Sequence, residues 1–205
     1  MAAATVGCEV FGIAASMFSS GKTKAVYELQ NQPTLVLVDD PNHQLGNPAL
    51  RDQIANEIGF HLEQQEVIDQ VIAPGQLNDL AAALGERYAA MPVDQIGRRL
   101  GARQVIHVQV ESVALQTGPG VIQPTARVQV KVIDADHGQR LFPTGSAVPA
   151  GGYALTIQFR QRPHEQIDRG SSVVLGRQLA QRIARDVARL FHDYALRKIG
   201  EPFDD

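Results

Sequence analysis

Residues 106–111 and residues 127–132 alternate strictly between apolar and polar side chains. Alternation with a period of two places all the apolar side chains on one face of a strand. The segment Asp134–Gly138 follows the second of these stretches and has the composition of a tight turn between two strands. The middle of the chain is therefore predicted to form antiparallel strands that bury only one face.

The first half of the chain has different patterns. Residues 34–40 form a continuous apolar run that ends in two aspartates, which is typical of a strand covered on both faces. In residues 47–65 apolar side chains recur at every fourth position, which predicts a helix capped by Asn47 with Pro48 in its first turn. Further elements are expected as follows: strands at 24–29, 66–72 and 153–159, and helices at 74–88 and 92–102, with Gly85 and Gly101 as helix ends.

Residues 171–200 are predicted to form one long amphipathic helix. Its opposite face is rich in arginine, and a basic amphipathic helix can lie on anionic lipid or in an acidic groove. The apolar stripe is nevertheless wide enough for the sheet to need it, so we expect this helix to pack on the core. The residues of the stripe are Leu175, Leu179, Ile183, Val187, Leu190 and Tyr194.

The order of these elements predicts an α+β fold, specifically an α/β two-layer sandwich. A mixed sheet with an antiparallel hairpin half would be covered by helices, and the long C-terminal helix would be added to it. We expect a single domain over residues 23–200, a flexible tether over residues 1–22 and a tail over residues 201–205. The sequence contains no run of about 18 or more uncharged apolar residues, which is the length that a membrane-spanning helix needs.

Two sequence motifs in the middle of the chain resemble motifs of a known α/β domain. That domain is shared by the TolB amino-terminal domain, the curli-secretion lipoprotein and the lipoprotein activators of penicillin-binding proteins. The whole chain is also similar to uncharacterised bacterial lipoproteins with the same order of elements. The resemblance covers roughly residues 24–145 and implies this fold and a place in the cell envelope. It is carried by Leu100–Ala102 with Val105–Val110, and by Val130–Ala135 with Gly138 and Leu141.

The only cysteine, Cys8, follows Val6 and Gly7 as in the lipobox of bacterial lipoproteins. In those proteins the thiol takes a diacylglyceryl group, and cleavage before the cysteine leaves an acylated N-terminus. Thr5 stands where leucine is usual, and no basic or long apolar segment precedes it, which we reconcile by a natural start further upstream. The alternative is a small hydrophobic cysteine in a frayed terminus. We expect Cys8 to be the lipidation site.

Two clusters combine carboxylates with histidine, and such ligands can hold a divalent cation. The same residue types also initiate turns, and we expect the chain to bind no metal and no cofactor. The candidate ligands are Asp39, Asp40 and His43 in the first cluster, and Asp134, Asp136 and His137 in the second.

Other motifs for catalysis or nucleotide binding are incomplete. The segment 19–24, SSGKTK, resembles the end of a phosphate-binding loop, but that motif needs glycine at position 16, where this chain has Ser16. The sequence also contains no Gly-x-Ser-x-Gly motif of the kind that holds a nucleophilic serine. The formal net charge of −3 provides no general basic field for nucleic acid.

These observations predict a lipoprotein that is not an enzyme and that acts as a binding or assembly module of the bacterial cell envelope. We expect it on the periplasmic face of a membrane, preferentially the outer membrane. Its partners would be the membrane, through the lipid anchor, and another envelope protein, but not nucleic acid. The alternatives are a small metal-binding protein or hydrolase that uses Asp39, Asp40 and His43, and a self-assembling component of a secretion complex.

Overall fold

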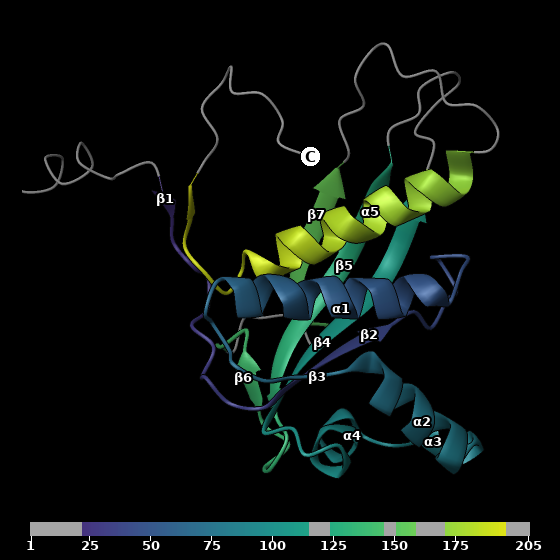
Figure 1. Cartoon of the computed structure of the whole chain (residues 1–205), viewed down its shortest axis with the longest axis vertical. Helices are drawn as coiled ribbons and strands as arrows, with labels where there is room; N and C mark the ends of the chain where they lie inside the picture. The colour runs from purple at the N-terminus through teal and green to yellow at the C-terminus, as the bar shows by residue number, and fades with distance from the viewer. Residues whose placement is uncertain (1–21, 115–123, 146–150, 159–170, 196–205) are drawn as a thin grey trace, which may run out of the picture.

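A computed structural model describes residues 22–114, 124–145, 151–158 and 171–195 of the 205-residue chain. Figure 1 shows a twisted sheet with helices packed against it. The strands are β1 (Lys22–Thr23), β2 (Thr34–Asp39), β3 (Val71–Ile72), β4 (Gln104–Ala114), β5 (Thr125–Asp134), β6 (Arg140–Phe142), β7 (Tyr153–Gln158) and β8 (Tyr194–Ala195). The helices are α1 (Ala49–Gln64), α2 (Pro74–Leu84), α3 (Glu86–Ala89), α4 (Val93–Arg99) and α5 (Ser171–Ala188).

The main sheet has six strands and is mixed, as the sequence predicts. Its order is β3-β2-β4-β5-β6, and β7 also pairs with β5. The pairs β2–β3 and β2–β4 are parallel, whereas β5 runs antiparallel to β4, β6 and β7. The α+β class and the antiparallel half of the sheet are therefore confirmed, and the predicted turn after Asp134 does join β5 to β6, with Gly138 at φ 68°.

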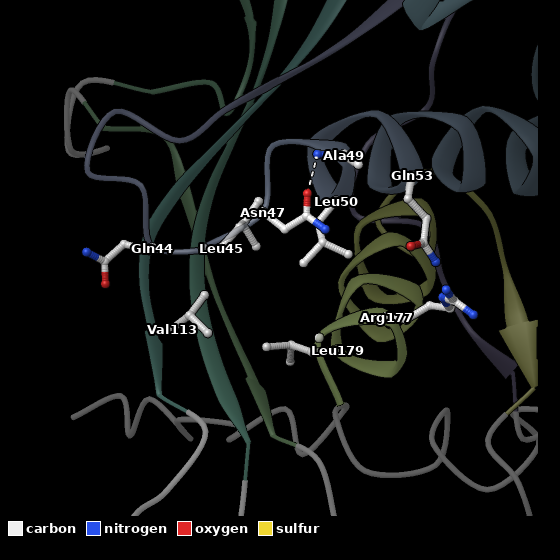
Figure 2. A pocket seen from close by; sticks show the side chains of 11 residues that line it. Gln44, Leu45, Asn47, Ala49, Leu50, Gln53, Val113, Arg177 and Leu179 are labelled. Atoms are coloured by element: carbon white, nitrogen blue, oxygen red, sulfur yellow. Dashed lines mark hydrogen bonds between the residues drawn. The ribbon is translucent and has the colours of Figure 1, made fainter. Parts of the chain in front are cut away.

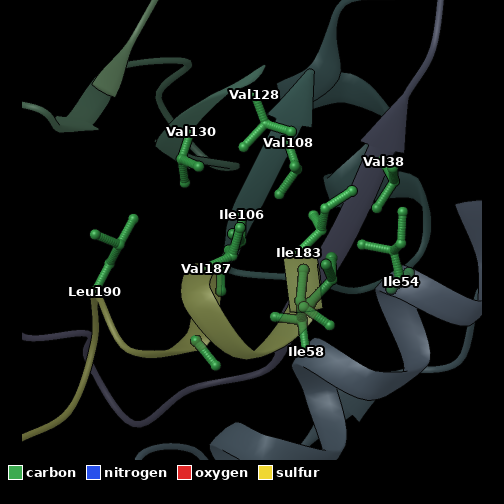
Figure 3. Close-up of a cluster of buried hydrophobic side chains, with 14 of the residues drawn as sticks. Val38, Ile54, Ile58, Ile106, Val108, Val128, Val130, Ile183, Val187 and Leu190 are labelled. Carbon is green, nitrogen blue, oxygen red and sulfur yellow. The ribbon is translucent and has the colours of Figure 1, made fainter. Parts of the chain in front are cut away.

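The larger core lies between the sheet and helices α1 and α5, which cross the same face (Figure 1). Each helix contributes a stripe of buried aliphatic side chains, and the sheet contributes its valines and isoleucines (Figure 3). The helical stripes contain Ile54, Ile58 and Leu62 of α1 and Leu179, Ile183 and Val187 of α5, and the strands contribute Val36, Val38, Ile106, Val108, Val128 and Val130.

A smaller core lies on the opposite face of the sheet, where Ile96 of α4 packs with Leu35, Leu37 and Val105. This second layer changes the expected pattern of β4. Its residues 104–108 are all buried, so strict one-sided burial begins only at Gln109. His107, which the alternation places on a polar face, is consequently buried.

The predicted helix over residues 171–200 is too long, because α5 ends at Ala188. After it, the carbonyl of Leu190 accepts hydrogen bonds from the backbone N–H groups of Val26 (2.8 Å) and Tyr27 (3.0 Å). The chain then forms the short strand β8, which pairs with β1, and Tyr194 lies in this strand rather than in the helical stripe. Residues 196–200 lie outside the described residues.

The same contacts correct the prediction of a strand at residues 24–29. The strand in this part of the chain, β1, ends at Thr23, and residues 24–29 run as a non-regular segment against the end of α5. The predicted helix at 74–88 is also divided into α2 and α3 at Gly85, whose φ of 55° ends α2. Gly101, with φ 79°, likewise follows the end of α4, as expected.

The arginine-rich face of α5 lies outside its buried stripe, and part of its charge is neutralised locally. Asp186 accepts hydrogen bonds from Arg182 (2.9 Å) and Arg189 (3.3 Å). The stripe itself is buried from Leu175 to Val187, so the prediction that this helix packs on the core is confirmed. Within the ranges that the structure describes, none of the helices is both long and apolar enough to span a membrane.

Candidate binding site

A pocket of 460 Å³ opens where the loop after β2, the first turns of α1, the end of β4 and the first turns of α5 meet (Figure 2). Ligand sites in α/β proteins commonly lie outside the carboxyl ends of parallel strands, and this pocket lies beside the carboxyl ends of β2 and β4. We refer to it as the α1–α5 pocket. Its lining consists of Gln44, Leu45, Gly46, Asn47, Ala49, Leu50, Gln53, Val113, Gly176, Arg177 and Leu179.

Asp40 shapes the loop that forms one wall of the α1–α5 pocket. Its carboxylate accepts hydrogen bonds from the backbone N–H groups of Gln44 (2.8 Å) and Leu45 (2.9 Å). His43, before these two residues, and Gly46, after them, have positive φ angles of 53° and 67° respectively. Aspartate is well suited to this position because its short side chain can bond backbone groups a few residues further along.

Asn47 links this loop to α1. Its Oδ1 atom accepts a hydrogen bond from the backbone N–H of Ala49 at 3.0 Å, which is the dashed line in Figure 2. The predicted capping role of Asn47 at the start of the helix is therefore confirmed. The cap turns the chain so that Asn47, Leu50 and Gln53 all line the pocket.

The lining combines aliphatic walls with polar groups. Leu45, Leu50, Val113 and Leu179 form the apolar part, and Figure 2 shows these side chains around the opening. The polar side chains are those of Gln44, Asn47, Gln53 and Arg177. An apolar pocket with a few polar groups is the usual composition of a small-ligand site.

The candidate ligands of the first acidic cluster point to different environments. Asp40 is committed to the two backbone N–H groups, and His43 is exposed. Asp39 lies near the buried His107, with its Oδ2 atom 3.9 Å from Nε2 of the histidine. The interaction with His107 holds the pKa of Asp39 below its usual value, although partial burial of the carboxylate opposes the shift.

The second cluster lies in the β5–β6 turn, where Asp136 also forms an ion pair with Arg103, with 3.0 Å between Oδ2 of the aspartate and Nε of the arginine. Asp134 accepts hydrogen bonds from the backbone N–H groups of Asp136 (2.8 Å) and His137 (3.1 Å), and it lies 3.0 Å from Nδ1 of His137. These bonds to His137 and to the backbone lower the pKa of Asp134. The cluster thus stabilises a hairpin turn.

The two clusters do not meet in space. In the sheet, Asp39 pairs with Gln109 and Asp134 pairs with Gln104, five residues apart along β4. At the rise of a β-strand, that separation is about 17 Å. Among the residues described by the structure, no group of three or more His, Cys, Asp or Glu side chains is arranged to hold a metal ion.

Other predicted features lie partly beyond the described residues. Cys8 and Ser16 fall in residues 1–21, and only the last residues of the segment SSGKTK are described, where Lys22 and Thr23 form β1. The α1–α5 pocket itself was not predicted. The Asn47–Pro48 cap and the acidic turn before it were visible in the sequence, but Val113 and Arg177 come to the pocket from distant elements.

No protein-family model matches the chain. No curated protein matches it either. Several solved structures resemble it, among them the PelC dodecamer from Paraburkholderia phytofirmans, with 14% identity over 83% of this chain and 95% of that chain and a TM-score of 0.44. Lipoprotein GNA1162 from Neisseria meningitidis has 12% identity over 75% and 99% of the two chains and a TM-score of 0.46. The LpoB C-terminal domain from Salmonella enterica has 13% identity over 64% and 84% and a TM-score of 0.36.

One of these solved structures is described as a lipoprotein. At these identities the likeness is one of fold.

Proposed function

We propose that this chain is a non-enzymatic binding or assembly module of the bacterial cell envelope. It is held on the periplasmic face of a membrane, preferentially the outer membrane, by a lipid on Cys8. The α1–α5 pocket is the part of the domain that binds its partner.

The composition of the α1–α5 pocket is the observation that carries the binding role. Its side chains are aliphatic, amide and guanidinium groups. Such groups hold a ligand by apolar contact, hydrogen bonds and charge, and they keep their protonation state at neutral pH. The pocket therefore suits recognition better than acid–base or nucleophilic chemistry, which needs groups that exchange protons or form covalent bonds.

The N-terminal sequence supports the anchored location. Val6, Gly7 and Cys8 match the last positions of a lipobox, and thirteen residues, 9–21, separate Cys8 from the first strand, β1. A single lipid chain of about 14 carbons binds a membrane only marginally, whereas two or more chains give a stable anchor. A diacylglyceryl group on the thiol would meet this requirement.

Metabolic labelling tests the anchor. The gene is expressed in a bacterium with its own upstream codons, and the cells are fed an alkyne analogue of palmitate. We expect the wild-type chain to carry the label and to fractionate with membranes, and Cys8→Ala to lose both properties. Val10→Ala, in the same segment, is the matched control and should behave as the wild type. Labelling of Cys8→Ala at the wild-type level would refute the anchor.

A further inference from the structure

We infer that the α1–α5 pocket binds a peptide segment in which an aliphatic side chain lies next to an acidic group. This inference rests on the proposed function, since it names the chemistry of the partner that the binding module recognises. It follows from the apolar walls, from the hydrogen-bonding atoms that remain available in the lining, and from the charge of Arg177.

The walls set the size and polarity of the part of the ligand that enters. Leu45, Leu50, Val113 and Leu179 come from the loop, α1, β4 and α5, so the apolar surface surrounds the cavity instead of forming one flat face (Figure 2). A volume of 460 Å³ lies within the range of roughly 300–1,000 Å³ that is usual for small-ligand pockets. An aliphatic side chain with its flanking backbone fits such a space.

The amide side chains offer both donors and acceptors. Gln44 and Gln53 each use their Nε2 atom as a donor, to the carbonyl of Asn42 (3.2 Å) and to the carboxylate of Glu57 (2.8 Å) respectively. Within the described residues their Oε1 atoms accept no hydrogen bond. In Asn47 the acceptor is used instead, because its Oδ1 atom accepts the N–H of Ala49. The N–H donors on its Nδ2 atom remain available to a ligand.

This mixture matches a peptide group, which carries one N–H donor and one C=O acceptor. The Oε1 acceptor of Gln53 suits the N–H, and the Nδ2 donors of Asn47 suit the C=O. A fatty acid presents only a carboxylate, which accepts hydrogen bonds and offers no donor to the Oε1 atom of Gln53. The polar lining therefore favours a peptide over a lipid chain.

Arg177 gives the α1–α5 pocket a preference for a negatively charged ligand. It is exposed at the pocket, and no described residue forms an ion pair with it, in contrast to Arg182 and Arg189, which share Asp186. A guanidinium binds carboxylates through paired hydrogen bonds. An acidic side chain or a C-terminal carboxylate beside the aliphatic group would meet it.

Methyl NMR of the full chain, labelled at leucine and valine, tests the inference. The probes are the peptide N-acetyl-Val-Leu-Asp, its neutral analogue N-acetyl-Val-Leu-Asn-amide, and octanoate. We expect the acidic peptide to shift the methyl signals of Leu45, Leu50, Val113 and Leu179 in a saturable manner. The neutral peptide should bind about threefold to tenfold more weakly, as should the acidic peptide to Arg177→Gln.

Two further variants complete the design. Arg185→Gln removes an exposed arginine from the same helix outside the pocket lining, and it should leave the affinity unchanged. Gly176→Leu places an aliphatic side chain beside Leu50, whose Cδ1 atom lies 3.4 Å from the position of a Cβ on residue 176. This variant should abolish binding while the methyl signals of the core residue Val130 keep their positions.

Tighter binding of octanoate than of the acidic peptide at the same methyl groups would overturn the inference in favour of a lipid ligand. Absence of saturable shifts with the acidic peptide would also overturn it, as would equal weakening by Arg185→Gln and Arg177→Gln. The lipid anchor is tested separately by labelling of Cys8, so the binding inference can fail while the proposed envelope location stands, and the reverse holds as well.

Discussion

The carboxylate of Asp40 lies 2.9 Å from the backbone nitrogen of Leu45, and this bond holds a leucine of the pocket wall in place. The same carboxylate also accepts the N–H of Gln44. Asp40, which the sequence suggests as a metal ligand, thus supports the loop that forms one wall of the α1–α5 pocket. The loop in turn leads to the cap of α1.

Asp40→Ala is expected to lower the free energy of unfolding by about 1–3 kcal/mol, because two backbone donors lose a charged acceptor at a nearly buried position. Chemical denaturation measures this change. Asp79→Ala, which removes an exposed aspartate from α2, is the control and should stay within about 0.5 kcal/mol of the wild type. Equal stability of the two variants would show that Asp40 does not support the loop.

Gly97→Ala is expected to destabilise the domain by about 1–3 kcal/mol through overpacking. A Cβ on residue 97 of α4 would lie 2.5 Å from Cγ2 of the buried Val105 and 3.2 Å from Cβ of Ala135. Gly75→Ala, in α2, meets no atom within 4 Å and should be neutral or slightly stabilising. In the double variant with Val105→Ala the two losses should not add, because the smaller residue removes the clash; additive losses would contradict the packing argument.

Phe142→Ala is expected to lower the free energy of unfolding by about 3–5 kcal/mol. The ring is buried and contacts the rings of Tyr27, Tyr153 and Phe191, with centroids 5.2, 5.4 and 6.2 Å away. It therefore joins the segment after β1, the start of β7 and the end of α5. Phe142→Leu should cost markedly less in the same thermal and denaturant measurements. An alanine variant as stable as the leucine variant would indicate that the ring cluster contributes little.

The Asp39–His107 pair predicts a dependence of stability on acid pH. Because the interaction with His107 lowers the folded-state pKa of Asp39, the contribution is complete above the ordinary carboxyl pKa and is lost as the pH falls through the lowered value. Arg51 and the backbone N–H of Asp40 act in the same direction. The pKa of Asp39, followed by carboxyl carbon NMR, should therefore rise in His107→Leu.

His43→Leu is the control for that titration, since His43 is exposed on the loop. It should leave the pKa of Asp39 where the wild type has it. If His107→Leu also leaves this pKa unchanged, then the arginine and the backbone, rather than the histidine, set it.

Patterns that depend on neighbours in the sequence predicted the local structure well. The period of four in α1, the Asn47 cap and the glycine ends of α2 and α4 all depend on contacts within a few residues. The alternation in β5 predicted its buried face, because each side chain of a strand points to one side or the other of the sheet.

The sequence predictions were wrong or incomplete where segments that are distant in the sequence meet in the fold. The amphipathic pattern continued to Tyr194, but the helix ends at Ala188 because the carbonyl of Leu190 is taken by Val26 and Tyr27. His107 is buried, and the smaller core on the second face of the sheet includes its neighbour in β4, Val105. The α1–α5 pocket is a further case, since its walls come from four elements that no local pattern brings together.

Mass spectrometry of the N-terminal peptide tests the proposed function most directly. The chain is expressed in a bacterium from its gene with the upstream codons, extracted from membranes with detergent and digested with trypsin. We expect a peptide that begins at Cys8, ends at Lys22 and carries a diacylglyceryl thioether on the cysteine. A peptide in which Cys8 is unmodified and still preceded by Gly7 would contradict it.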